Sequence, residues 1–269
     1  MIRLAVFGSH VGKSSSPAIH RMFARQCGLE IDYRAIEANT ENFATLLQEL
    51  AAMGGTGCNV TAPLKNQAWK LAQRSSNSAQ RARAANTLVF EAGGGCYADN
   101  TDGRGLVQDL ETNLGCELNG ARVCIIGAGG AAAGILGDLL KQQPASVVVA
   151  NRTIERAQNL QRIFGSDVSA ISLNSLDQEE PFDVIFNAST LGHTGGLPQL
   201  PLTLFHATSL CYDLNYGAAA EPLRSFCLEN AITFQDGFGM LVEQAVLSFT
   251  LWTGQKPDTA PVMSALRMG

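Results

Sequence analysis

Short β-branched runs alternate with amphipathic segments along the first part of the chain. The extended runs lie at residues 3–8, 32–38 and 57–61. A helix is predicted after each run, and the three helices begin at Ser16, Thr40 and Leu64. This alternation is typical of βαβ units and of a mostly parallel sheet. The pattern therefore predicts an α/β fold for this part.

Residues 86–100 interrupt the alternation. Three glycines at 93–95 join two extended runs, and such a junction favours a hairpin of antiparallel strands. We expect a helix to begin near Asp102. The polar, glycine-containing stretch 113–120 that follows is the clearest candidate for a domain boundary.

After residue 120 the alternation of strands and helices starts again. Nearly continuous apolar runs, as expected when helices cover both faces of a parallel sheet, lie at residues 121–126, 146–150, 182–186 and 209–212. The segment 239–254 has helical spacing, with a broad apolar face formed by Met240, Leu241, Ala245, Phe249 and Trp252. We expect this helix to pack back against the first domain.

Composition indicates a globular protein of 269 residues, because 46% of them are hydrophobic and only 16% are charged. The net charge of −5 gives no general electrostatic reason to expect a nucleic acid or an anionic membrane as a partner. The N-terminal apolar run is too short for a signal peptide, and no apolar run reaches the length of a membrane span.

Seven cysteines form an odd set without a CxxC pair, and the four histidines show no i, i+4 pairing. They predict neither a disulfide framework nor a metal site. Together with the absence of a signal sequence, they indicate a reducing, cytoplasmic location.

Gly127, Gly129 and Gly130 follow the run 122–126 directly and precede an alanine-rich helix. Glycines in this position allow a tight turn, and the backbone N–H groups at the helix N-terminus can hold a pyrophosphate. The order of strand, glycine turn and helix therefore favours a dinucleotide site over a simple strand-to-helix turn.

The end of the next strand indicates which dinucleotide binds. An acidic residue here would bind the ribose 2′-hydroxyl of NAD, but the chain has Asn151, Arg152, Thr153 and then Arg156. Arginine can bind a 2′-phosphate through charge-assisted hydrogen bonds, so the sequence favours NADP. The alternative is that both arginines are simply solvated at an exposed helix start.

Polar groups that could carry chemistry lie at Ser14, Ser16, Lys65, Asn86 and Asp102. Helix capping could explain Ser16 and Asp102, and a turn could explain Asn86. Lys65 is harder to explain by stability alone. It is predicted in the first turn of a helix opened by Pro63, where the helix dipole disfavours a cation.

Taken in order, the segments AVFGSHVGKSSSPAIH, GCNVTAPLK, AANTL, DNTDGRG, IIGAGGAAAG, ANRT, NAST, CYDLNY and DGFGMLVEQA resemble the shikimate dehydrogenase family over essentially the full chain. The family reversibly reduces 3-dehydroshikimate to shikimate with NADPH, in the route to chorismate and the aromatic amino acids. The resemblance implies two α/β domains: residues 1–104 with 238–269 as the substrate-binding catalytic domain, completed by C-terminal helices, and residues 105–237 as a Rossmann-type NADP-binding domain. Catalysis is expected in the cleft between domains.

The resemblance also implies a role for each matching residue. Lys65 would be the catalytic acid and base, with Asp102 as its hydrogen-bonded partner. The substrate would be bound by Ser14, Ser16, Thr61, Asn86, Asp102, Tyr216 and Gln244. The cofactor NADP(H) would be held by Gly127, Ala128, Gly129, Gly130, Ala131, Asn151, Arg152, Thr153, Arg156, Leu214 and Gly237.

Some positions depart from the family pattern. Lys13 stands where histidine is common, Ser15 where lysine is frequent, and Ala133 where arginine is often found. These departures keep open a relative that oxidises quinate or uses NAD, and a non-catalytic NADP-binding regulator is a further alternative. The expected partners are a small-molecule substrate and, as an ordinary possibility, a second copy of the chain in a homodimer.

Overall fold

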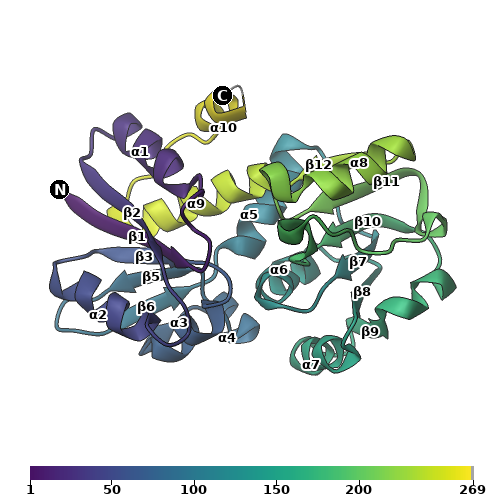
Figure 1. The fold of residues 1–269 in the computed structure, drawn as a ribbon, viewed down its shortest axis with the longest axis horizontal. Helices are drawn as coiled ribbons and strands as arrows, with labels where there is room; N and C mark the ends of the chain where they lie inside the picture. Colours follow the sequence, from purple (N-terminus) through teal and green to yellow (C-terminus); the bar gives the residue numbers. More distant parts are fainter. Residues whose placement is uncertain (268–269) are drawn as a thin grey trace. The chain divides into compact units, whose positions relative to one another are not determined.

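Within residues 1–267, which the computed structural model describes, the chain forms two six-stranded sheets (Figure 1). Each sheet belongs to its own compact unit. The first unit comprises Met1–Gln108 and the chain from Leu241 onward, and the second comprises Asp109–Met240. No helix within residues 1–267 has both the length and the apolar character that crossing a membrane requires.

The sheet of the first unit has the strand order β2-β1-β3-β5-β6-β4. Its strands are β1 (Ile2–Gly8), β2 (Ile31–Glu37), β3 (Gly57–Val60), β4 (Arg74–Ser75), β5 (Thr87–Phe90) and β6 (Cys96–Asp99). Strand β1 pairs parallel to both β2 and β3, and β5 pairs antiparallel to β3 and β6. The predicted hairpin across the glycines is therefore confirmed, as is the mostly parallel character of the N-terminal strands.

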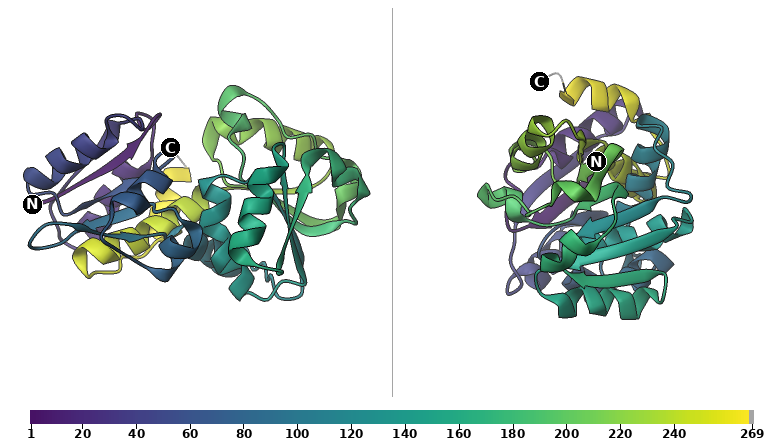
Figure 2. Two further views of the ribbon diagram at one scale, coloured as in Figure 1. Left: turned by 90° about the horizontal axis from the view of Figure 1, so that it is seen from below. Right: turned by 90° about the vertical axis from the view of Figure 1, so that its right-hand side faces the viewer.

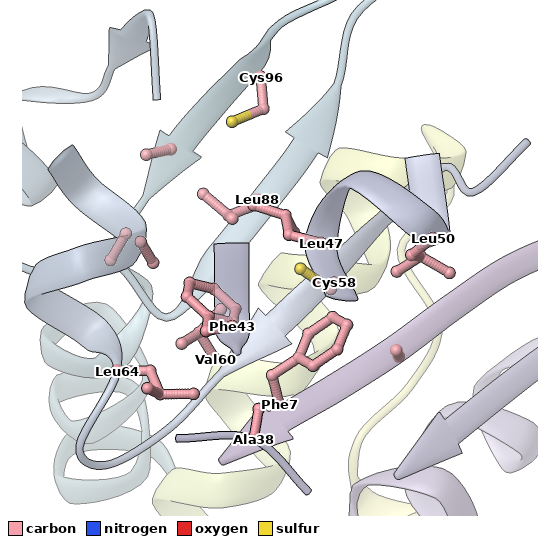
Figure 3. Close-up of a cluster of buried hydrophobic side chains, with 14 of the residues drawn as sticks. Phe7, Ala38, Phe43, Leu47, Leu50, Cys58, Val60, Leu64, Leu88 and Cys96 are labelled. Atoms are coloured by element: carbon pink, nitrogen blue, oxygen red, sulfur yellow. The ribbon is translucent and has the colours of Figure 1, made fainter. Parts of the chain in front are cut away.

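Helices of the first unit cover both faces of this sheet. They are α1 (Ser16–Gln26), α2 (Phe43–Ala52), α3 (Lys65–Leu71), α4 (Asn77–Ala82), α5 (Asp102–Gln108), α9 (Phe238–Thr253, within this unit from Leu241) and α10 (Ala260–Arg267). Phe7 of β1 and Leu88 of β5 pack with Phe43 of α2 and Leu64 on one face (Figure 3). The other face of β1 packs against Trp252 of α9.

Close contacts fix α9 against this unit. Trp252 Nε1 donates a hydrogen bond of 2.9 Å to the Leu88 carbonyl oxygen. A Cβ atom at Gly105 of α5 would lie 2.6 Å from the backbone nitrogen of Gln244, so only glycine allows α5 and α9 to approach this closely. The start of α5 and the middle of α9 are therefore held side by side.

The second unit has the strand order β12-β11-β10-β7-β8-β9, and all its described strand pairs are parallel. Its strands are β7 (Arg122–Ile126), β8 (Ser146–Asn151), β9 (Val168–Ser172), β10 (Phe182–Asn187), β11 (Phe205–Asp213) and β12 (Thr233–Asp236). Its helices are α6 (Gly130–Lys141), α7 (Ile154–Phe164) and α8 (Glu221–Glu229), with the short segments η1 (Asp109–Asn113), η2 (Leu173–Gln178), η3 (Leu191–Thr194), η4 (Leu202–Leu204) and η5 (Gly217–Ala219).

This order is that of a doubly wound Rossmann sheet. From the central strand β7 the chain adds β8 and β9 on one side, and from β10 it adds β11 and β12 on the other side. Because crossovers between parallel strands are right-handed, α6 and α7 lie on one face of the sheet and α8 on the other (Figures 1 and 2). Leu223 and Cys227 of α8 pack on Cys124, Ile126 and Ile185 of the sheet. The predicted α/β class with a Rossmann-type unit is confirmed.

Two element starts differ from the sequence expectation. Helix α2 begins at Phe43 rather than Thr40, because the side chains of Asn39 and Asn42 bond to backbone N–H groups between residues 39 and 42 and form a turn there. Pro63 does not open α3. It lies in a turn closed by a 2.9 Å bond from Leu64 N to the Thr61 carbonyl, and the helix begins at Lys65.

Candidate active site

A lysine and an aspartate form the centre of the polar site in the first unit. Lys65, the first residue of α3, places its Nζ 2.6 Å from Oδ2 of Asp102, the first residue of α5. The Asp102 side chain is buried, with 6% of its surface exposed, whereas Lys65 keeps 15%. Because little water surrounds the pair, its electrostatic attraction is stronger than that of an ion pair on the surface.

Asn86 holds the other oxygen of this carboxylate. Its Nδ2 lies 2.8 Å from Asp102 Oδ1 and 3.0 Å from Oε1 of Gln244 on α9. Thr101 donates its backbone N–H to Asn86 Oδ1 at 2.9 Å, which fixes the orientation of the amide. The structure thus brings together four of the predicted site residues, and neither Asn86 nor Asp102 is explained by a turn or capping role alone.

A second layer of buried polar side chains supports Asn86. Thr87 Oγ1 lies 3.0 Å from Asn86 Oδ1 and 2.7 Å from Ser248 Oγ on α9. Asn59 Nδ2 donates to Ser248 Oγ at 3.0 Å, and Asn59 Oδ1 accepts a 2.7 Å bond from the Tyr33 hydroxyl. Sequence reasoning did not select these four supporting residues. Their signal was a polar residue inside an apolar run, as at Asn59 and Ser248.

His20 lies behind this layer and is buried against aromatic rings. Its imidazole stacks on Tyr33, with ring centroids 4.4 Å apart and planes 11° from parallel. Burial lowers the pKa of His20 to about 3, so its ring is neutral at physiological pH. His20 therefore adds no charge beside the lysine–aspartate pair.

The serines near the start of α1 connect to the same network at one point. Ser16 is buried and lies within hydrogen-bonding reach of Tyr33, and its backbone N–H donates to Ser14 Oγ at 3.2 Å. The interpretation of Ser16 as a helix cap is wrong, because Ser15 occupies the cap position and makes no side-chain capping bond. Thr61 is half-buried, with its methyl group against Gly8.

The glycine turn of the second unit has the geometry of an anion site. Gly127 adopts φ +107°, and a Cβ atom there would lie 3.1 Å from the backbone of Ala188. Gly129 caps the N-terminus of α6, and the space around it is open. The free N–H groups and the positive end of the dipole at the start of α6 can therefore hold a pyrophosphate, with Ala128 in the turn and Gly130 and Ala131 in the first turn of the helix.

The segment after β8 presents cations to solvent. Asn151 Nδ2 donates to the Thr153 carbonyl at 2.7 Å, which shapes the turn into α7. Arg152 and Arg156 are exposed, and the ion pairs formed within residues 1–267 include neither of them. Both guanidinium groups are therefore available to a phosphate at this edge of the sheet.

The ends of β10 and β11 carry a buried polar cluster. Asp213 Oδ1 accepts hydrogen bonds from Asn187 Nδ2 at 3.1 Å and from the backbone and side chain of Asn215 at 2.9 and 2.7 Å. Burial raises the pKa of Asp213, and these hydrogen bonds oppose that shift. Gly237 lies against the Leu214 carbonyl, where a Cβ atom would come within 2.5 Å of the oxygen.

Tyr216 also belongs to the second unit, where its ring contacts Phe238 edge-on with centroids 6.3 Å apart.

Within residues 1–267, no group of three or more histidine, cysteine, aspartate or glutamate side chains could hold a metal ion. The fold and these sites define a two-unit α/β protein with a dinucleotide-binding unit and a lysine–carboxylate site.

Three family models match successive parts of the chain. They are the shikimate dehydrogenase substrate binding domain over residues 6–88, shikimate/quinate 5-dehydrogenase over 109–194, and the shikimate 5′-dehydrogenase C-terminal domain over 237–267. A shikimate dehydrogenase (NADP(+)) of Marinobacter nauticus is 43% identical over 98% of this chain and 97% of its own length. The chain belongs to the shikimate dehydrogenase family, as the sequence motifs predicted.

The chain is also similar to solved structures over its full length. An Ael1 enzyme from Pseudomonas putida is 38% identical and has a TM-score of 0.89, with 99% of this chain and 98% of that chain covered. Shikimate 5-dehydrogenase from Thermus thermophilus, solved in complex with NADP(H) and shikimate, is 31% identical with a TM-score of 0.84, and the match covers 100% of this chain and 99% of that chain.

Proposed function

We propose that this protein catalyses the reversible NADPH-dependent reduction of 3-dehydroshikimate to shikimate. The observation that carries the proposal is the 2.6 Å pair of Lys65 and Asp102, held by Asn86 in the unit that matches the family's substrate binding domain. NADP-dependent relatives and a neighbour solved with NADP(H) and shikimate support the choice of cofactor and substrate. The product would enter the biosynthesis of chorismate and the aromatic amino acids.

The chemistry assigns distinct tasks to the pair. Bound NADPH supplies the hydride that reduces the ketone. Lys65 donates a proton from Nζ to the oxygen that becomes the shikimate hydroxyl, and it accepts that proton in the reverse reaction. Asp102 orients the ammonium group and balances its charge, while Asn86 and Gln244 hold the carboxylate in place.

The polar residues around this pair suit a polyol acid. Each buried hydroxyl of the substrate needs a hydrogen-bonding partner, because an unpaired one is costly. We assign substrate binding to Ser14, Ser16, Thr61, Asn86, Asp102, Tyr216 and Gln244. Gly127, Ala128, Gly129, Gly130 and Ala131 would hold the cofactor pyrophosphate, Asn151, Arg152, Thr153 and Arg156 its 2′-phosphate, and Leu214 and Gly237 the nicotinamide.

We also propose a division of tasks along the chain, to which Tyr216 of the second unit is the exception. We assign substrate binding and catalysis to residues 1–104 with 238–269, and NADP binding to residues 105–237. We further propose that the protein works in the cytoplasm on a small-molecule substrate, as a monomer or a homodimer, without nucleic acid or membrane partners. The net charge of −5 supports the last point.

Initial rates with the purified protein test the proposed function. We expect fast NADP+ reduction with shikimate, and much slower reduction with quinate or with NAD+ in place of NADP+. Faster turnover of quinate or NAD+ would identify a related dehydrogenase of different specificity. NADPH binding without turnover of any of these substrates would indicate a regulator and contradict the proposal.

Removing one of the cations after β8 should weaken the preference of the protein for NADP+ over NAD+. In the Arg152→Ala variant we expect KM for NADP+ to rise about 10-fold to 100-fold, because a charge-assisted bond to the 2′-phosphate is lost, while KM for NAD+ stays nearly constant. Arg162→Ala, which removes an exposed arginine from the far end of α7, serves as the control. An equal rise in KM for both cofactors would show that Arg152 does not read the 2′-phosphate.

A further inference from the structure

The order of strands divides the dinucleotide site into two halves. Strands β7 and β10 are neighbours, and the chain runs outward from them in opposite directions. A dinucleotide lies across this switch point, at the carboxyl ends of the strands. Because Asn151 and Arg152 follow β8 on the 2′-phosphate side, the nicotinamide half falls over the ends of β10 and β11.

Asp213 is the buried acid at these strand ends. It is the last residue of β11, next to Leu214, and none of its surface is exposed. Its Oδ1 accepts three hydrogen bonds, from Asn187 and from the backbone and side chain of Asn215. Its Oδ2 is also buried and has no hydrogen-bond partner.

No cation compensates this acid within residues 1–267. The ion pairs described there do not include Asp213. The charge of Asp236, which acts on Asp213, is a like charge and has Arg224 as its own partner at 3.4 Å. Burial raises the pKa of Asp213, and the three N–H donors on Oδ1 oppose that shift because they favour the ionised form. The ionised carboxylate is a negative charge without a cationic partner among the described residues, in a region of low dielectric constant.

We propose that the Asp213 carboxylate makes the nicotinamide half of the site favour the oxidised, cationic cofactor NADP+ over neutral NADPH. The inference rests on the proposed function, since it requires the nicotinamide to bind at these strand ends. The two cofactor forms share the same phosphates and adenosine and differ in the charge of the nicotinamide ring. The ratio of their dissociation constants therefore isolates the effect of a nearby charge on that ring.

The size of the effect follows from Coulomb's law. Two unit charges within about 10 Å of each other, at an effective dielectric constant of about 20, change a binding ratio roughly tenfold. Neutralising Asp213 should therefore raise Kd for NADP+ relative to Kd for NADPH by roughly that factor. A purely structural role would alter both dissociation constants together.

Calorimetric titration of the full-length protein with NADP+ and with NADPH measures the ratio. Asp213→Asn keeps an acceptor oxygen for the three N–H donors and removes the charge, and Asp213→Ser provides a second neutral variant in case the first does not fold. Asp167→Asn is the matched control. It makes the same charge change at an exposed residue before β9, at the opposite edge of the sheet.

We expect the ratio of Kd for NADP+ to Kd for NADPH to rise roughly tenfold in either folded Asp213 variant and to stay unchanged in Asp167→Asn. Equal changes in both dissociation constants, or no change, would overturn the role of the charge while leaving the proposed function intact. A wild-type protein that binds neither nucleotide would overturn both the inference and the proposed cofactor.

Discussion

The Lys65→Ala variant should lose most of its activity. We expect kcat for shikimate oxidation to fall by about 10²-fold to 10⁴-fold, because the proton of the reacting hydroxyl loses its acceptor. The dissociation constant for NADP+ should stay nearly constant, because the glycine turn and the arginines that we assign to the cofactor belong to the second unit. Initial rates and calorimetric titration measure the two quantities.

Lys70→Ala provides the matched control for this prediction. Lys70 lies on the same helix, α3, and is exposed, so its removal changes the charge equally without touching the Asp102 carboxylate. Its kcat should remain within a factor of about two of the wild type. A Lys65→Ala enzyme with kcat near the wild-type value would refute the assignment of Lys65 as the acid and base.

The Asp102→Ala variant should lose stability in the first unit. Breaking a fully buried ion pair from one side costs about 3–5 kcal/mol. Because Lys65 keeps 15% exposure, we expect a smaller loss of about 2–3 kcal/mol in the free energy of unfolding. The chain has two tryptophans, Trp69 and Trp252, and both lie in the first unit, so their fluorescence during urea denaturation follows that unit alone.

A double variant separates the charge effect from packing. Asp102→Leu with Lys65→Met replaces the pair by apolar side chains, and it should be more stable than Asp102→Ala because no unpaired ammonium remains. Asp32→Ala, which removes an exposed pair with Arg34, should cost less than about 1 kcal/mol. A loss for Asp102→Ala as small as that for Asp32→Ala would mean that the pair contributes little to stability.

Much of the fold and the centre of the site could be predicted from the sequence. Alternating runs identified the strands, the glycines at 93–95 identified the hairpin, and the glycines from 127 to 130 identified the turn before α6. These signals are local, because a turn or a strand is encoded by neighbouring residues. Lys65 was identifiable because a cation at a helix start is unfavourable for stability.

The supporting residues could not be predicted, because their roles depend on contacts between distant parts of the chain. Ser248 bonds to Thr87, which is 161 positions away, and it follows the apolar run of residues 245–247 in a helix that hydrophobic spacing describes well. Asp213 likewise directly follows the largely buried run 209–212 at the end of β11. A polar residue in such a run indicates a buried partner, but only the fold shows which partner it is.

The return of α9 to the first unit affects the order in which this protein can fold during synthesis on the ribosome. The sheet of that unit is complete by Asp99, but Trp252, which covers one face of β1, and Ser248, which bonds to Thr87, are made only after the entire second unit. A nascent chain ending near residue 240 therefore exposes apolar sheet surface and leaves buried hydroxyl and amide groups without partners. The second unit is continuous in sequence, so it can reach its native structure while the first unit still waits for its last helix.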